Sequence, residues 1–206
     1  SVTESKSDSS DDYSETNAKV EGVDEADIVK NDGEYIYMIK GNDVRIIKAY
    51  PEDEMKEMSQ ISIEDISFYP NELYLDDSIL IVIGDGGYYN PYYKQGVQLI
   101  SNPYYIRRTF VYIYNIQDKA NPTLARSFEI DGNYTDSRKV DDTLYLVLNT
   151  YNYYGDTENA EDLIPAYKDS LDGSEQKLAS CDQITYFPRQ REFNYLIVSA
   201  IPLNSA

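Results

Sequence analysis

Short runs of apolar residues, each introduced by an acidic or glycine-containing turn, recur along the chain. The clearest copies are Asp32–Ile39, Asp76–Ile83 and Asp141–Leu148. In each copy the turn precedes a segment dominated by Ile, Leu, Val and Tyr, which are residue types that favour a pleated, half-buried surface. A sequence motif that recurs along a chain is typical of repeat architectures, so the pattern predicts a tandem array of β-units.

Each unit is expected to contain several short strands separated by tight turns. The strands are predicted at 27–30, 34–39, 44–49 and 55–63 in the first unit, at 71–75, 78–83, 110–114 and 124–130 in the second, and at 137–140, 143–148 and 195–200 in the third. Helix signals are weak: Glu52–Met58 favours one turn, and Ala160–Lys168 favours a short helix inside an insertion.

Four antiparallel strands per unit, in tandem, are typical of the blades of a β-propeller. The fold prediction is therefore all-β, a β-propeller fragment of about three blades. Residues 201–206 occupy the place that 115–122 hold in the second unit, so the third blade is expected to lack its last strand. The chain is expected to be part of a longer propeller, or to associate through open blade edges.

The domain organisation follows from the same pattern. An acidic, Ser-rich segment at the start has too little apolar surface to fold, and it is predicted to be a flexible tail or linker. The predicted divisions are the tail at 1–19, a partial propeller at 20–206, and blades at approximately 27–63, 71–130 and 137–206.

Composition and charge narrow the function classes. The chain has 22 Tyr and 5 Phe but no Trp, and its net charge is −19. Such an acidic surface repels phosphate backbones and anionic lipids, which argues against nucleic acid and acidic membranes as partners. The sequence has no His, which weakens most hydrolase and metalloenzyme interpretations. Cys181 is the single cysteine, and it is expected to be a buried or half-buried structural residue.

A family resemblance adds to this picture. The chain resembles secreted bacterial and archaeal proteins that carry a β-propeller domain distantly related to WD-type repeats. The matching segments are Val20–Lys30, Asp32-Gly33, Tyr35–Tyr37, Ala49–Pro51, Asn71–Tyr74, Asp118–Pro122 and Tyr134–Arg138. The resemblance implies an exported, surface-associated protein with a longer full-length propeller. It supplies no catalytic residues.

Two long insertions between the second and third strands of their units are the candidate functional feature. They span 84–108 and 149–183, and alternation of turns in a meander predicts that both leave from one face of neighbouring blades. The candidate ligand-binding residues are Tyr88, Tyr89, Tyr92, Tyr93, Tyr104, Tyr105, Tyr151, Tyr153 and Tyr154. Tyr offers a rigid contact surface with a hydroxyl group. The alternative is that these rings pack on one another and cap the blades.

Acidic clusters are the other candidate chemistry. The Asp-rich turns at Asp85–Gly87, Asp131–Asn133, Asp141-Asp142 and Asp172-Gly173 do not have the ligand spacing of a calcium loop, so they are interpreted as turns. The three carboxylates of 23–27 are interpreted as structural.

The prediction from sequence is a non-enzymatic extracellular or cell-surface interaction module that uses no cofactor and no metal. Its partner is expected to be a protein, peptide or glycan. A glycoside-active enzyme and an assembly element that pairs through open blade edges are the alternatives.

Overall fold

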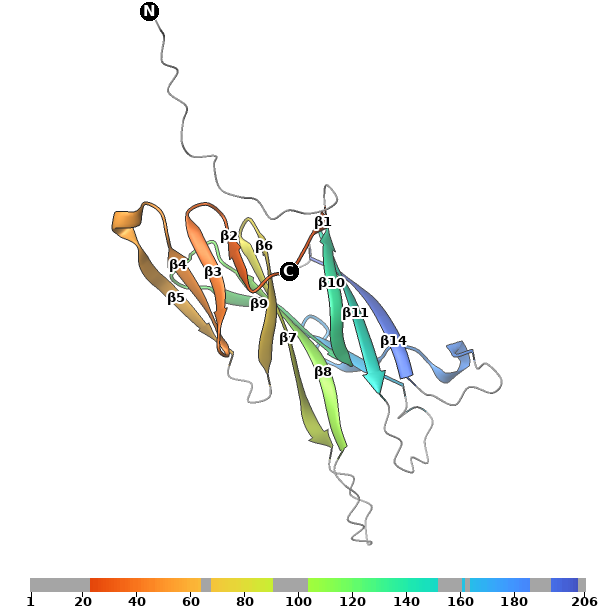
Figure 1. Cartoon of the computed structure of the whole chain (residues 1–206). Helices are drawn as coiled ribbons and strands as arrows, with labels where there is room; N and C mark the ends of the chain where they lie inside the picture. Colours follow the sequence, from red (N-terminus) through yellow and green to blue (C-terminus); the bar gives the residue numbers. More distant parts are fainter. Residues whose placement is uncertain are drawn as a thin grey trace, which may run out of the picture.

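The computed structural model describes residues 23–63, 68–90, 104–151, 161, 164–185 and 194–203, with the backbone alone at 88–90, 104–105 and 151. Within these residues the secondary structure consists of β-strands and short 3-10 turns. The strands form three antiparallel sheets that stand next to one another as successive blades (Figure 1). None of the described helices is long and apolar enough to cross a membrane.

Each sheet corresponds to one predicted unit. The first contains β2 (Val29–Asn31), β3 (Tyr35–Lys40), β4 (Asp43–Lys48) and β5 (Lys56–Ser62), in that order. The second contains β6 (Tyr69–Asp76), β7 (Ile79–Asn90), β8 (Tyr104–Asn115) and β9 (Thr123–Asp131), and it is extended by β12 (Ala166–Asp169) and β13 (Glu175–Lys177). The third contains β1 (Val23–Asp24), β10 (Asn133–Val140), β11 (Thr143–Tyr151) and β14 (Asn194–Pro202).

The all-β fold and the antiparallel blades predicted from the sequence are confirmed. The third blade has three strands of its own repeat, β10, β11 and β14. The fourth strand of that sheet is β1, which comes from the beginning of the described chain and pairs with β10 through Val23↔Val140.

Two apolar clusters hold the three blades together. The first lies between the first and second sheets and includes Tyr37, Ile46, Phe68 and Phe110. The second lies between the second and third sheets and is built around strands β7, β8 and β11. The rings of Phe68 and Phe110 meet edge to face at 5.9 Å, a geometry that adds to their burial energy. Gly84 is required here because a Cβ atom would lie 2.4 Å from the Phe68 ring.

The central blade explains why the second of the repeated segments is apolar at every position from Ile79 to Ile83. Leu80 and Val82 point into the first cluster, while Ile81 and Ile83 belong to the second. A strand that is covered on both faces needs apolar residues at every position. In the third blade, by contrast, Tyr145 is 40% exposed.

Three local predictions are wrong. In the segment predicted to be a helix, 160–168, Glu161 lies in a 3-10 turn, but 166–168 belong to strand β12 because Tyr167 and Lys168 pair with β9 of the neighbouring blade. Asp85–Gly87 is not a turn, since β7 continues through it. Cys181 is exposed, because it lies in a surface 3-10 turn (Cys181–Gln183) that Ser180 and Gln183 cap.

Candidate functional site

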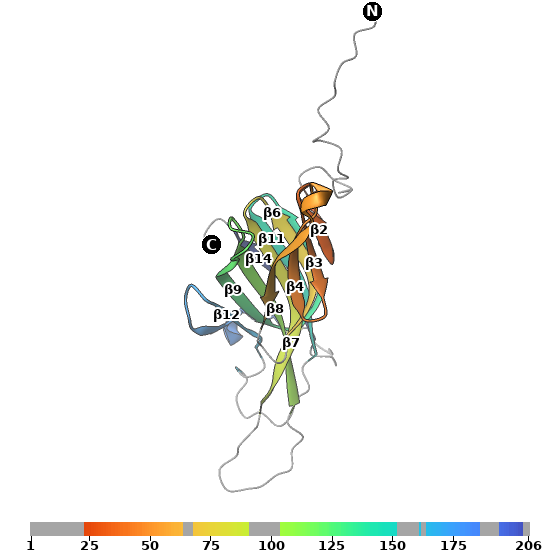
Figure 2. The same ribbon diagram turned by 90° about the vertical axis from the view of Figure 1, so that its left-hand side faces the viewer.

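The β7–β8 hairpin is longer than its blade. Strand β6 accompanies β7 only as far as Tyr69↔Asp85, and β9 accompanies β8 only from Asp131↔Arg108. Beyond these points β7 and β8 pair only with each other, from Gly87↔Arg107 to Asn90↔Tyr104. We call these residues, 87–90 and 104–107, the ribbon. It projects past the rest of the blades (Figures 1 and 2).

The ribbon contains four of the tyrosines predicted to contact a ligand. Its backbone register places Tyr89 opposite Tyr105 and Tyr88 opposite Ile106, and Tyr104 lies opposite Asn90. The structure therefore brings residues from both sides of the first insertion together at one end of the second blade. Whether their rings contact a ligand or pack together stays a prediction.

The remaining candidate tyrosines belong to two groups. Tyr151 ends β11, opposite Asn194, on the same side of the molecule as the ribbon (Figure 1). This placement agrees with the prediction that both insertions leave from one face. The candidates Tyr92, Tyr93, Tyr153 and Tyr154 lie outside the described residues.

Part of the second insertion adds two strands to the neighbouring blade, which the sequence did not predict. Its residues 166–177 form the hairpin β12–β13, which leaves the third blade and adds to the outer edge of the second. The register pairs Tyr167 with Ile130 and Asp169 with Phe128. We call residues 166–177 the docked hairpin. It lies beside β9 in Figure 2.

Arg126 anchors one end of the docked hairpin. Its side chain is buried, and its Nε and Nη2 donate hydrogen bonds to the two oxygens of Asp169 at 3.1 and 2.7 Å. Its Nη1 donates to the carbonyl oxygen of Pro202 at 2.9 Å, which ties the hairpin to the third blade as well. The guanidinium also lies 4.3 Å from the centroid of the Phe128 ring. Hydrogen bonding to Arg126 lowers the pKa of Asp169.

Arg108 is the second anchor. It is buried, and it donates to Asp131 Oδ1 at 2.8 Å, to Glu129 Oε2 at 2.9 Å, and to Glu175 on β13. The second oxygen of Asp131 accepts a hydrogen bond from the backbone N–H of Ala166 at 2.8 Å. The sequence interpretation of Asp131 as a turn residue therefore missed its main contacts. One arginine and three carboxylates hold the hairpin at the base of the ribbon.

The N-terminal motif is the second polar region. Residues 23–31 pair with β10 of the third blade, bridge to β6 of the second through Asp27↔Leu73, and continue into β2 of the first. They connect the innermost strands of all three blades. The buried Lys30 ammonium binds Asp24 Oδ1 at 2.9 Å and the carbonyl oxygen of Glu25 at 2.5 Å. These contacts agree with the structural interpretation of the motif.

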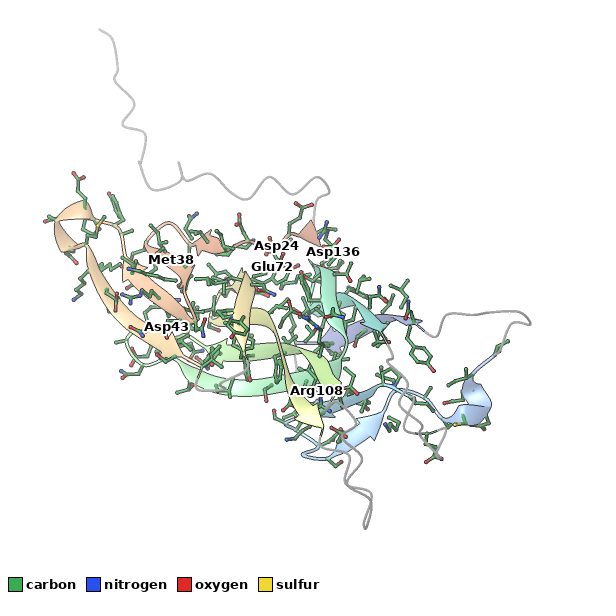
Figure 3. The ribbon with its side chains drawn as sticks, turned by 60° about the horizontal axis from the view of Figure 1, so that its bottom comes forward. Asp24, Met38, Asp43, Glu72, Arg108 and Asp136 are labelled. Carbon is green, nitrogen blue, oxygen red and sulfur yellow. The ribbon has the colours of Figure 1, made fainter. Side chains whose placement is uncertain are left out.

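A hydroxyl network continues this region between β6 and β10. The Tyr74 hydroxyl lies 2.8 Å from Ser137 Oγ, and the Tyr134 hydroxyl donates to the Glu72 carboxylate. Burial raises the pKa of Tyr74 to about 12, and burial together with the Glu72 hydrogen bond raises the pKa of Tyr134 well above its usual range. Both phenols therefore remain neutral. Figure 3 shows Glu72 near Asp24 and Asp136 at this inner side.

Among the described residues, no group of three or more His, Cys, Asp and Glu side chains is arranged to hold a metal ion.

Asp85, which the sequence placed in a turn, links two blades. One of its oxygens accepts a hydrogen bond from Asn71 Nδ2 at 2.6 Å, and the other accepts one from the Tyr134 N–H at 3.2 Å.

Comparison with known proteins identifies the fold family. A family model described as a beta propeller domain matches residues 13–206. An uncharacterized protein of Methanocaldococcus jannaschii is 31% identical over 136 residues, which cover 66% of this chain and 17% of that protein. An uncharacterized protein of Archaeoglobus fulgidus is 32% identical over 144 residues, covering 70% of this chain and 20% of the relative. The matched region is thus a fifth or less of either relative. No solved structure matches the chain.

Proposed function

The chain belongs to the beta propeller domain family, and we propose that it is a non-enzymatic binding module whose contact surface is the ribbon. The observation that carries the proposal is the geometry of β7 and β8. Four successive residue pairs, from Gly87↔Arg107 to Asn90↔Tyr104, extend beyond both neighbouring strands. Among the described strands none pairs with this extension on either side, and its contact with the rest of the blade includes the hydrogen bond from the Gly132 N–H to the Arg107 carbonyl oxygen at 2.9 Å. A two-stranded extension of this kind adds little to a blade core, so we infer that it serves an external contact.

The composition of the ribbon supports contact with a macromolecule. Tyr88, Tyr89, Tyr104 and Tyr105 make up half of its eight residues. Tyr combines a large apolar surface with a hydroxyl group and loses little conformational entropy on binding, which is why binding loops are rich in it. Tyr151, at the end of β11 on the neighbouring blade, is a further candidate on the same side.

The proposed partner is a protein, a peptide or a glycan outside the cell. The exterior location rests on the resemblance to secreted proteins. The net charge of −19 favours neutral or basic partners.

A non-enzymatic role is favoured by how the inner carboxylates are used. The Asp24 carboxylate forms an ion pair with the Lys30 ammonium, and the Glu72 carboxylate accepts a hydrogen bond from the Tyr134 hydroxyl. A pair of catalytic carboxylates would have to flank a substrate bond with defined spacing. Carboxylates that are already engaged by neighbouring blades fit a structural role better.

The test compares the wild-type chain with a variant that carries Tyr→Ser substitutions at positions 88, 89, 104 and 105, on peptide and glycan arrays. We expect at least one peptide or glycan that the wild type binds to lose at least tenfold in affinity for the variant, with little change in thermal stability. The matched control is Tyr145→Ser, which removes an exposed ring from the third blade. Equal binding by the ribbon variant and the wild type would contradict the proposal.

A second candidate function is assembly through a blade edge. Strand β14 ends the third sheet, and its Leu196 and Val198 are 72% and 67% exposed. Exposed apolar residues on an edge strand favour pairing with another chain. Light scattering on the wild type and on Leu196→Lys/Val198→Lys tests this: a concentration-dependent dimer that the substitutions abolish supports assembly, and a wild-type monomer at high concentration contradicts it.

A further inference from the structure

A groove of about 410 Å³ lies between the first and second blades, at the opposite end of β8 from the ribbon. One wall is strand β5 of the first blade, and the other is the turn that connects β8 to β9. Its volume lies within the range of small-molecule sites in proteins. Because the groove and the ribbon are at different ends of the same strand, a role for the groove does not depend on the function proposed for the ribbon.

The lining of the groove is polar but uncharged. Hydroxyl and amide groups come from Ser59, Gln60, Ser62, Tyr114, Asn121 and Thr123, and the apolar contributions come from Ile61, Ala120 and Pro122. None of these side chains is ionisable at neutral pH. Although the chain has a net charge of −19, no carboxylate is among the residues that line this groove, so the lining offers hydrogen-bonding groups without a formal charge.

The wall formed by the β8–β9 turn is held in place by contacts with the first blade. Ser59 Oγ donates to the carbonyl oxygen of Lys119 at 2.7 Å. The Lys119 ammonium lies 5.3 Å from the centroid of the Tyr37 ring and 3.8 Å from Asp32 Oδ2. Asp118 closes the turn by accepting from the Ala120 N–H at 3.0 Å. The groove is therefore formed before any ligand arrives, which lowers the entropic cost of binding.

Tyr114 provides the observation that points to a ligand. Its side chain is only 8% exposed, and its hydroxyl makes no hydrogen bond with any residue in the described part of the chain. The only fully buried side-chain polar atom without a partner in that part is Nε of Arg45, so the Tyr114 hydroxyl still reaches solvent. The groove is the surface that Tyr114 lines.

The chemistry of this hydroxyl is that of a neutral donor. Burial raises the pKa of Tyr114 to about 12, so the group keeps its proton at physiological pH. Because this hydroxyl reaches solvent and has no hydrogen-bond partner among the described residues, it is free to exchange a water molecule for a ligand oxygen.

We propose that this groove is a binding site for a neutral carbohydrate, such as a monosaccharide or the end of a short glycan. The Tyr114 hydroxyl donates to a sugar oxygen, while the Ser62, Thr123 and Asn121 side chains exchange hydrogen bonds with further hydroxyls. Sugars match this lining because they carry many neutral donors and acceptors on a small body.

The test is a titration of the full chain with maltose, cellobiose, lactose and chitobiose, followed by backbone amide NMR. We expect at least one of these sugars to shift the signals of Ser59–Ser62 and Ala120–Thr123. In Tyr114→Phe, which removes only the hydroxyl, we expect the dissociation constant for that sugar to rise at least tenfold. Tyr145→Phe, which removes an exposed hydroxyl on the third blade, is the matched control and should bind as the wild type does.

Two results would overturn the proposal. One is that none of the four sugars shifts the groove signals at the highest soluble concentration. The other is that Tyr114→Phe binds as tightly as the wild type while its amide spectrum shows an intact fold. Because Tyr114→Phe keeps the ring, and with it the packing in the first apolar cluster, loss of folding is not expected to obscure the outcome.

Discussion

The two insertions arise at equivalent places in neighbouring blades, yet they end in opposite situations. The first continues β7 and β8 into the ribbon, which has no third strand beside it among the described residues. The second returns to the protein as the docked hairpin and adds two strands to the neighbouring sheet. The difference is in their anchors: Arg108 and Arg126 bind carboxylates of the docked hairpin. Insertions at equivalent positions of the repeat therefore adopt different arrangements, and the docked one is the one that contacts both buried arginines.

The largest effect is expected from Arg126→Met. The substitution leaves Asp169 inside the protein without its bidentate partner and frees the Pro202 carbonyl group. Removing one partner of a buried ion pair costs about 3–5 kcal/mol of the free energy of unfolding. Urea denaturation measures this loss of the free energy of unfolding. Arg138→Ala, which removes a 43% exposed guanidinium, is the control and should cost less than about 1 kcal/mol. A similar, small cost for both variants would show that Arg126 does not anchor the hairpin.

A somewhat smaller effect is expected from Arg108→Met, about 2 kcal/mol, because its carboxylate partners reach solvent more than Asp169 does. The loss should be local: the N–H of Ala166, which is bound to Asp131, should exchange faster with solvent. Hydrogen exchange followed by amide NMR measures both the free energy of unfolding and the exchange rate of the Ala166 N–H. Unchanged exchange at Ala166 would mean that the hairpin docks without Arg108.

Acid should weaken the docked hairpin through Asp169. The Arg126 hydrogen bonds lower the pKa of Asp169 in the folded protein below the ordinary value of 3.8. This contribution is therefore complete above about pH 4 and is lost as the pH falls through the lower, folded pKa. We expect Asp169→Asn to be less stable than the wild type at pH 6, and the difference between the two to shrink towards pH 3. A difference that stays constant would contradict the assignment.

The smallest effect is expected at the ribbon. A chain in which Asn-Gly replaces residues 87–107 would close β7 and β8 with a two-residue turn between Gly86 and Arg108, which are already paired. Since no other described strand pairs with the ribbon, we expect the free energy of unfolding to change by less than about 1 kcal/mol. A loss as large as that of Arg126→Met would show that the ribbon supports the blade.

Sequence reasoning succeeded where the interactions are local or follow the strand period. The runs at 79–83 and 143–148 are strands because their side chains alternate between the two apolar clusters, or between a cluster and solvent. The turn at Asp172-Gly173 was also predictable, because Gly173 has a φ of 72°.

It failed where the partner lies in another blade. Strands β12 and β13 are four and three residues long, and no periodicity is visible over so few positions. The docking of β12 depends on Arg126, which is 43 positions before Asp169. Likewise, the two residues of β1 are a strand only because β10 of the third blade pairs with them. Side-chain contacts between residues so far apart leave no signal in a single sequence.

Backbone hydrogen exchange tests the contrast between the insertions most directly. We expect the amides of 166–169 to exchange about as slowly as those of their partner β9 in the wild type and much faster in Arg126→Met. We also expect the amides of 87–90 to exchange at least tenfold faster than those of 79–83 in the same strand. Slow exchange along the whole of β7, together with fast exchange at 166–169 in the wild type, would contradict the contrast.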